Sequence, residues 1–238
     1  MTQPSPEEPF QDAFARIEAA VEGGDTDLRE LGFWRLLAKV KADRALSEHW
    51  ADAAGRIDRR AFEARIRLRV PVWVGNTLLV IGTIVGGVAV GLALGSTTSE
   101  VVAGIALVAA GGIWSVTWHD LAHWIVGRIV GIRFTSYYLA GPFPPRPGLK
   151  TDYATYLRTP PIARAWMHAS GALATKLAPF VALAFWPLTN APWWSAAALL
   201  ALGIVQIVTD VTFSVRSSDW KKVRRERAVA RQQASAAR

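Results

Sequence analysis

The chain has 238 residues, enough for one large domain or two small ones, and a formal net charge of +8 at pH 7. Apolar residues make up 51% of the chain and are unevenly distributed along it. The lack of cysteine excludes a disulfide framework and thiolate metal sites. The basic excess lies beside apolar stretches of membrane length, so this charge does not indicate a nucleic-acid partner.

Composition divides the chain into three regions. Residues 1–69 are charged and polar, and we expect a small cytoplasmic helical region there. Residues 70–215, rich in Val, Ile, Leu, Ala, Gly and Trp, are predicted to form a four-helix membrane core. Residues 216–238 are strongly basic and are predicted to form a cytoplasmic tail. The predicted fold class is therefore all-α, a polytopic membrane protein with four transmembrane helices.

The first region reads as a helical hairpin. Ser5 and Pro6, followed by two acidic residues, are typical of a helix start. Apolar residues continue at helical spacing to Val21, and the Gly23-Gly24 pair ends the helix. A second helix is predicted to begin near residues 25–26. Its expected apolar face consists of Leu28, Leu31, Trp34, Leu37 and Val40.

The second region contains four stretches long enough to cross about 30 Å of hydrocarbon, which takes roughly 20 helical residues. They run from about 72 to 94, 101 to 126, 162 to 188 and 192 to 213. Glycines recur in the first stretch, at spacings that let helices approach closely, and we expect them to pack inside one bundle. These glycines are Gly82, Gly86, Gly87, Gly91 and Gly95.

The distribution of Lys and Arg predicts the orientation. Basic residues precede the first stretch, separate the second from the third and follow the fourth, whereas the loops 95–100 and 189–191 contain none. Basic loops mark the cytoplasmic side, so both termini are predicted to be cytoplasmic, in a bacterial plasma membrane. The basic tail is expected to lie against anionic lipid of the inner leaflet. Its basic residues include Lys221, Lys222, Arg224, Arg225 and Arg227.

The second stretch contains a candidate metal site in the segment Trp-His-Asp-Leu-Ala-His, residues 118–123. Side chains four residues apart share a helix face, with Cβ atoms roughly 5–6 Å apart, so His119 and His123 can bind one metal ion. Asp120 follows the first histidine, where its carboxylate can hold a water molecule. This is the spacing of H-E-x-x-H zinc peptidases, with Asp in the Glu position.

Such a site needs a third protein ligand, and the topology offers Asp210. The second and fourth stretches both run inward. At 1.5 Å per residue His119 and Asp210 lie roughly 27 Å and 26 Å along them, at nearly the same depth. His168 lies about 10 Å from the start of the third stretch and is a candidate residue of the cleft wall.

Each of these polar residues also has a simpler interpretation. The histidine pair can be interhelical hydrogen-bonding groups, and His168 can be bonded to a helix carbonyl. Asp210 at a matching depth favours the metal site, because uncompensated carboxylates inside membrane spans are rare.

The pattern resembles the site-2 protease family, intramembrane zinc metalloproteases with a three-helix catalytic core. The resemblance covers residues 101–220, about half of the chain. It implies that His119, His123 and Asp210 bind Zn²⁺ and that Asp120 is the general acid and base. It also implies a transmembrane protein substrate.

Two further segments are similar to that family, and several positions depart from it. Residues 170–175 resemble the small-residue segment A-G-P-x-A-N of the intervening helix, with Thr175 where Asn is typical. Residues 134–160, rich in Tyr, Pro and Gly, fall where relatives have a membrane-associated loop thought to present substrate. Asp120 replaces Glu, and Val211 stands where the family usually has Gly. The Asn and Pro that normally precede the third ligand are missing.

Three hypotheses follow. The first is a zinc-dependent intramembrane endopeptidase, a zinc metallopeptidase that cleaves near the cytoplasmic side, in which Asp120 takes a proton from water and returns it to the leaving amine. The second is a catalytically inactive metal-binding relative that binds membrane partners, which the replacement of Glu by Asp favours. The third is a haem- or ion-binding membrane protein with His123 and His168 as facing ligands, which leaves Asp210 without a role.

Overall fold

The structure is a computed structural model and describes residues 8–95, 97–141, 146–212 and 218–236. The chain forms two compact units. The polar unit comprises residues 1–71, 130–164 and 226–238, and the apolar unit comprises residues 72–129 and 165–225. Helix accounts for 78% of the described residues, so the predicted helical class is confirmed.

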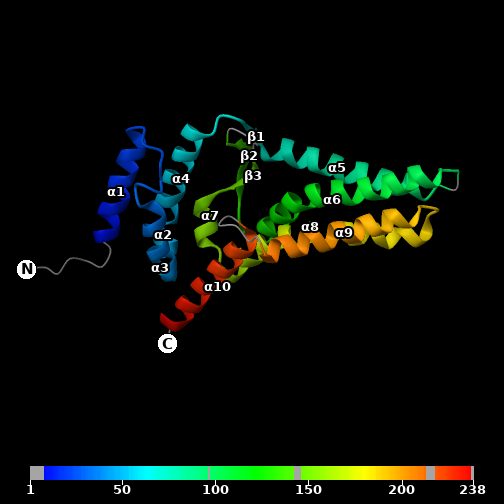
Figure 1. The fold of residues 1–238 in the computed structure, drawn as a ribbon. Coiled ribbons are helices and arrows are strands. Elements are labelled where there is room, and N and C mark those ends of the chain that lie inside the picture. Colours follow the sequence, from blue (N-terminus) through cyan, green and yellow to red (C-terminus); the bar gives the residue numbers. More distant parts are fainter. Residues whose placement is uncertain (1–7, 96, 142–145, 213–217, 237–238) are drawn as a thin grey trace, which may run out of the picture. The chain divides into compact units, whose positions relative to one another are not determined.

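The polar unit is built mainly from short helices around one apolar core (Figure 1). These helices are α1 (Glu8–Glu22), α2 (Phe33–Ala42), α3 (Arg44–His49), α4 (Ala51–Arg65) and α7 (Tyr153–Arg158). The core residues are Phe14, Ile17, Val21, Leu28, Phe33, Leu37, Val40, Ala51, Ala54, Ile57, Ala61 and Leu157. The Ser5-Pro6 helix start lies outside the described residues.

The second helix begins at Phe33, so the predicted start near residues 25–26 is wrong. Asp27 gives the reason, because its Oδ1 accepts two backbone N–H bonds at 2.9 and 3.2 Å and so favours turns over helix. Gly32, at the N-cap, has a φ of 76°, in the left-handed region that glycine tolerates. With this start Phe33 is fully buried, whereas Trp34 is 44% exposed.

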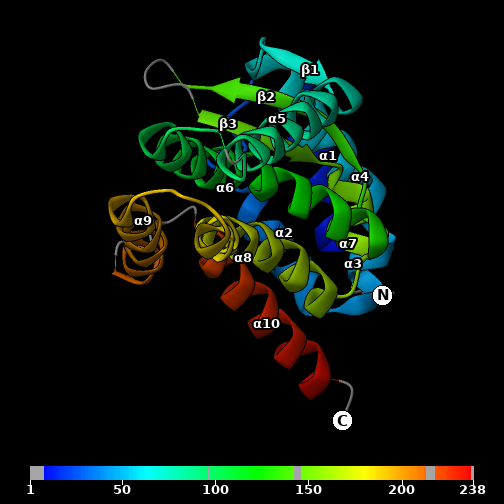
Figure 2. The same cartoon turned by 90° about the vertical axis from the view of Figure 1, so that its right-hand side faces the viewer.

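The polar unit also contains a small antiparallel sheet that the sequence analysis did not predict. Its strands are β1 (Arg69–Pro71), β2 (Phe134–Ala140) and β3 (Arg146–Thr151), in the order β1-β2-β3, and Figure 2 shows β2 beside β3. In its register Val70 pairs with Tyr137, which pairs with Leu149. The run Phe-Thr-Ser-Tyr-Tyr-Leu in β2 has high β propensity, and the Pro and Gly residues around it hid this signal.

Among the described residues, the apolar unit contains four helices that are long and apolar enough to cross a membrane, so the predicted number is confirmed on that basis. They are α5 (Val72–Ala93), α6 (Glu100–Ile129), α8 (Pro161–Phe185, extended by the 3₁₀ turn Trp186–Leu188) and α9 (Trp193–Thr212). Their packed residues include Val90, Ala93, Ala103, Ala106, Leu107, Ala110, Trp114, Ala178, Ala182, Ala191 and Leu199.

One glycine of the first span shows why small residues are needed there. A Cβ on Gly86 would overlap the indole of Trp114, whose Nε1 donates a hydrogen bond to the carbonyl oxygen of Thr83 at 3.0 Å. Gly86 therefore permits close packing of α5 on α6, as predicted for this bundle. Gly87 and Gly91 have open space around them.

The last helix, α10 (Asp219–Ala236), contributes a buried carboxylate to the polar unit. Glu226 is fully buried, and its Oε1 accepts hydrogen bonds from Lys41 Nζ at 2.6 Å and from the Tyr156 hydroxyl at 2.9 Å. Its Oε2 lies 2.8 Å from Nε of Arg164, which is 1% exposed. Burial raises the pKa of Glu226, but the charges of Lys41 and Arg164 outweigh it and hold the pKa below its ordinary value of 4.5.

Replacing Glu226 by Gln should lower the free energy of unfolding by about 3 kcal/mol, because the buried Lys41 and Arg164 lose their counter-charge. Thermal unfolding of the purified protein in detergent measures this change. The matched control Glu48→Gln breaks an exposed pair with Arg44 and should cost less than about 1 kcal/mol. Since the pKa of Glu226 is lowered on folding, its contribution should be complete above pH 4.5 and lost as the pH falls through the lowered pKa. Equal effects of the two substitutions would contradict the buried cluster.

Candidate metal centre

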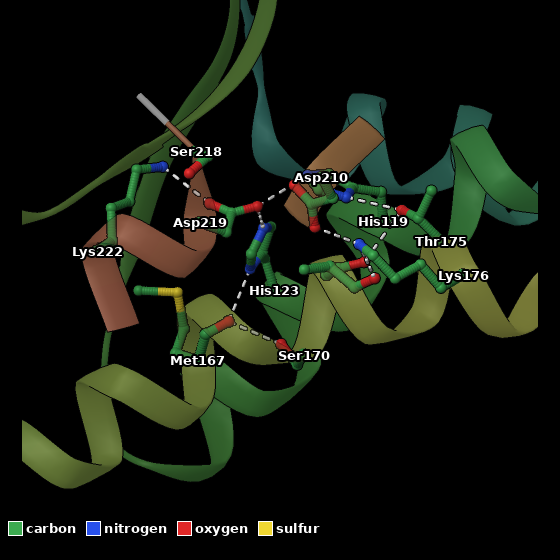
Figure 3. Close-up of polar contacts among 12 residues, drawn as sticks. His119, His123, Met167, Ser170, Thr175, Lys176, Asp210, Ser218, Asp219 and Lys222 are labelled. Carbon is green, nitrogen blue, oxygen red and sulfur yellow. Dashed lines mark hydrogen bonds and ion pairs between the residues drawn. The ribbon is translucent and has the colours of Figure 1, made fainter. Parts of the chain in front are cut away.

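Three potential metal ligands meet in the apolar unit (Figure 3). His119 and His123 lie one turn apart on α6, and Asp219 is the first residue of α10. The Nε2 atoms of His123 and His119 lie 3.2 and 3.5 Å from Oδ2 of Asp219. One ligand atom from each residue lies within 4.8 Å of the others, so this group can hold a metal ion.

The other ring nitrogens fix the direction of each imidazole. Nδ1 of His119 lies 2.9 Å from Oγ1 of Thr175, and the Thr175 hydroxyl itself donates to a main-chain carbonyl at 3.0 Å. Nδ1 of His123 lies 2.7 Å from the carbonyl oxygen of Met167, which can only accept. Both Nδ1 atoms therefore carry the hydrogen in the neutral rings. Both Nε2 lone pairs then point toward the carboxylate, as metal-binding imidazoles require.

The charge of Asp219 suits a cation among these atoms. Its Oδ1 accepts a hydrogen bond from Lys222 Nζ at 2.9 Å, which leaves Oδ2 for the imidazoles. Burial raises the pKa of Asp219, but the hydrogen bond and charge that His123 supplies when its ring is protonated, together with the charge of Lys222, outweigh it. The pKa therefore lies well below its ordinary value, and Asp219 is ionised at neutral pH.

Helix α8 packs closely against His123 because it carries glycine at the contact. A Cβ on Gly171 would lie 2.6 Å from both Cδ2 and Cε1 of the His123 ring, too close for any larger residue without displacing the imidazole. The small-residue segment 170–175 thus supplies both the room for His123 and, through Thr175, the acceptor for His119.

An open cavity of about 440 Å³ adjoins the group. Helices α6, α8, α9 and the start of α10 contribute to its wall, and its lining residues are polar or charged except Ala172. The lining residues are His119, Ala172, Thr175, Lys176, Gln206, Thr209, Asp210, Ser218 and Asp219. A reactant in this cavity would reach the ligand group directly.

Asp210, the third ligand expected from the sequence, lines this cavity but does not belong to the ligand group. Its Oδ2 lies 2.5 Å from Nζ of Lys176, which also donates to the carbonyl oxygen of Ala172 at 3.0 Å. Asp210 and His119 line the same cavity. Direct metal binding by Asp210 stays a prediction.

The other two candidate residues lie near the group without joining it. Asp120 is half-buried on α6 and is not among the described residues that line the cavity. The ring centroid of His168 lies 6.4 Å from that of His123. Both nitrogens of His123 face other groups, the Met167 carbonyl and Asp219, so His123 offers neither nitrogen to His168.

Asp219 was not predicted from the sequence, because it lies beyond the last predicted span in a stretch interpreted as a basic tail. Its one signal was an acidic residue preceding a run of basic ones, and Lys222 is one turn away on the same helix. Met167 was missed for a different reason, because it orients His123 through its main-chain carbonyl, which no side-chain pattern indicates.

Comparisons of the chain with family models, curated proteins and solved structures found no match. The site-2 protease family therefore stays a hypothesis that rests on the motif residues.

Metal affinity should depend on the three ligands and on the orientation of their rings. His119→Ala, His123→Ala and Asp219→Asn should each abolish tight binding, because each removes a ligand atom. Thr175→Val should weaken binding about 10- to 100-fold, since it removes the acceptor of the His119 Nδ1 hydrogen.

Titration of the detergent-purified protein with Zn²⁺ against a competing chelator measures these affinities. Thr209→Val is the matched control, because Thr209 lines the same cavity and bonds only to carbonyls of its own helix. Wild-type affinity in Asp219→Asn would remove α10 from the site, and wild-type affinity in Thr175→Val would remove the ring-orienting role of that hydroxyl.

Proposed function

We propose that this protein is a zinc-dependent intramembrane endopeptidase that cleaves membrane-embedded protein substrates near the cytoplasmic side. The observation that carries this proposal is the convergence of His119, His123 and Asp219 beside a cavity lined by polar side chains, in a unit of membrane-length helices. Two imidazoles and one carboxylate form a ligand set used by zinc peptidases, with a further position open for a reactant.

Zinc is the proposed metal because two imidazoles and one carboxylate oxygen, with no thiolate, suit it. When bound, zinc supplies a Lewis acid that lowers the pKa of water and polarises a peptide carbonyl. The chain's own residues orient the ligands. Thr175 and the Met167 carbonyl fix the two rings, and Lys222 fixes the carboxylate.

The cavity also supports a peptide as the substrate. Gln206, Thr209 and Ser218 line it with side chains that can exchange hydrogen bonds with a peptide main chain. A transmembrane helix satisfies its backbone groups internally. The proposed substrate is therefore a segment that is unwound or lies at a helix end.

The proposal is tested with a transmembrane reporter that carries a Gly- and Pro-containing segment near its cytoplasmic end, reconstituted with the purified protein. Cleavage should be lost on chelation and restored by Zn²⁺, and Asp219→Asn should be inactive because it lacks a ligand. Tight zinc binding by the wild type without cleavage of any reporter in a graded series would instead favour the inactive metal-binding relative.

We also propose that α5, α6, α8 and α9 cross a bacterial plasma membrane, with both termini in the cytoplasm. The loops without Lys or Arg support this orientation. The exposed face of α10 is basic and opposes its buried residues, and we propose that it binds anionic lipid. Its exposed basic residues are Lys221, Arg224, Arg225, Arg227 and Arg231.

Reporter fusions test the orientation. Fusions after Thr97 and Asn190 should report the outside, because these loops lack basic residues, and fusions after Leu149 and Ala230 should report the cytoplasm. The fusions differ only in position, so the two expected outside are controls for the two expected in the cytoplasm, and the reverse. A cytoplasmic signal after Asn190 would overturn the arrangement of four spans.

A further inference from the structure

Two carboxylates line the cavity, and they have different partners (Figure 3). Oδ2 of Asp219 faces the imidazoles of His119 and His123. Oδ2 of Asp210 faces the ammonium of Lys176 at 2.5 Å. Asp219 is thus committed to the ligand group, whereas Asp210 lies outside that group and still faces the same cavity.

The ion pair of Asp210 and Lys176 is held in place yet remains open to the cavity. Lys176 is fixed by Asp210, by the Ala172 carbonyl oxygen at 3.0 Å and by the Trp220 ring, whose centroid lies 5.9 Å from Nζ. Each residue compensates the charge of the other inside a helix of membrane length. The Lys176 and Asp210 side chains nevertheless keep exposures of 17% and 24%. Lys176 and Asp210 could neutralise each other equally well if both were fully buried, so charge compensation alone does not explain why they line the cavity.

The position of Asp120 argues against it as the proton acceptor. A proton acceptor in peptide hydrolysis has to come within about 2.6–3.2 Å of the reacting group, so it has to face the cavity. Asp120 follows His119 on α6, and successive helix positions point in directions about 100° apart. Among the described lining residues Asp120 is absent and Asp210 is present.

We infer that Asp210 is the proton-transferring carboxylate of this site and that Lys176 is its positioning residue, an inference that rests on the proposed function. Asp210 takes one proton from the attacking water as the new C–O bond forms at the peptide carbonyl carbon. That proton passes to the leaving nitrogen as the C–N bond breaks, so one water is consumed and no other reactant is needed. Lys176 holds the carboxylate in place.

The experiment measures zinc affinity and reporter cleavage side by side in single variants of the full chain. Asp210→Asn should bind zinc within about twofold of the wild type and cleave about 10²- to 10⁴-fold more slowly, the usual contribution of such a carboxylate. This loss should exceed that of Asp120→Asn. Lys176→Met should also slow cleavage at unchanged zinc affinity, and Lys176→Arg should restore part of the rate. Glu100→Gln, an exposed carboxylate at the far end of α6, is the control and should change neither readout.

Three results would overturn the inference while leaving the proposed function intact. Loss of zinc in Asp210→Asn would make Asp210 a ligand. Wild-type cleavage in Asp210→Asn would remove it from proton transfer. A greater loss in Asp120→Asn than in Asp210→Asn, with zinc retained in both, would return the role to Asp120. A wild-type protein that binds no zinc, or that binds zinc and cleaves no reporter, would overturn the proposed function and the inference together.

Discussion

The site depends on two imidazoles that turn the same nitrogen toward one carboxylate. Because the Nδ1 hydrogens of His119 and His123 are bonded to Thr175 and to a main-chain carbonyl, both Nε2 lone pairs face Asp219. Two imidazole lone pairs at 3.2 and 3.5 Å from one carboxylate oxygen are stable together only with a positive charge among them, either a proton on a ring or a metal ion. Lys222 binds the other carboxylate oxygen and so leaves one oxygen for that charge.

Charge compensation also explains the other buried ionic groups of the chain. In the apolar unit, Lys176 and Asp210 are tolerated because each is the counter-ion of the other. In the polar unit, Glu226 is fully buried between Lys41 and Arg164, and removing Glu226 leaves two buried cations without their counter-charge. The first pair lines a cavity and the second group is sealed, so only the first can meet a reactant.

The helices of membrane length and the histidine pair were predictable, because apolar length and four-residue spacing are local properties of a sequence. The third member of the ligand group was not. Depths estimated by counting residues along straight helices can be compared only within the predicted spans, and Asp219 lies on α10, beyond the last of them. The start of α2 was predicted too early because the apolar residues over 28–40 recur at helical spacing, although Asp27 stabilises turns at the beginning of that stretch.

The presence of Asp210 in the cavity changes how the short side chain of Asp120 is interpreted. Asp reaches roughly 1.5 Å less far than Glu, about one C–C bond, and a misplacement of about 1 Å can cost roughly a hundredfold in rate. Taken alone, this replacement indicates lost activity. A decayed site would also be expected to lose its ring-orienting acceptors and the room beside its histidines, yet Thr175 and Gly171 provide both. A second, charge-compensated carboxylate faces the same cavity. Under the proposed function, the short side chain at position 120 is therefore better explained by a proton-handling role of Asp210 than by loss of the chemistry.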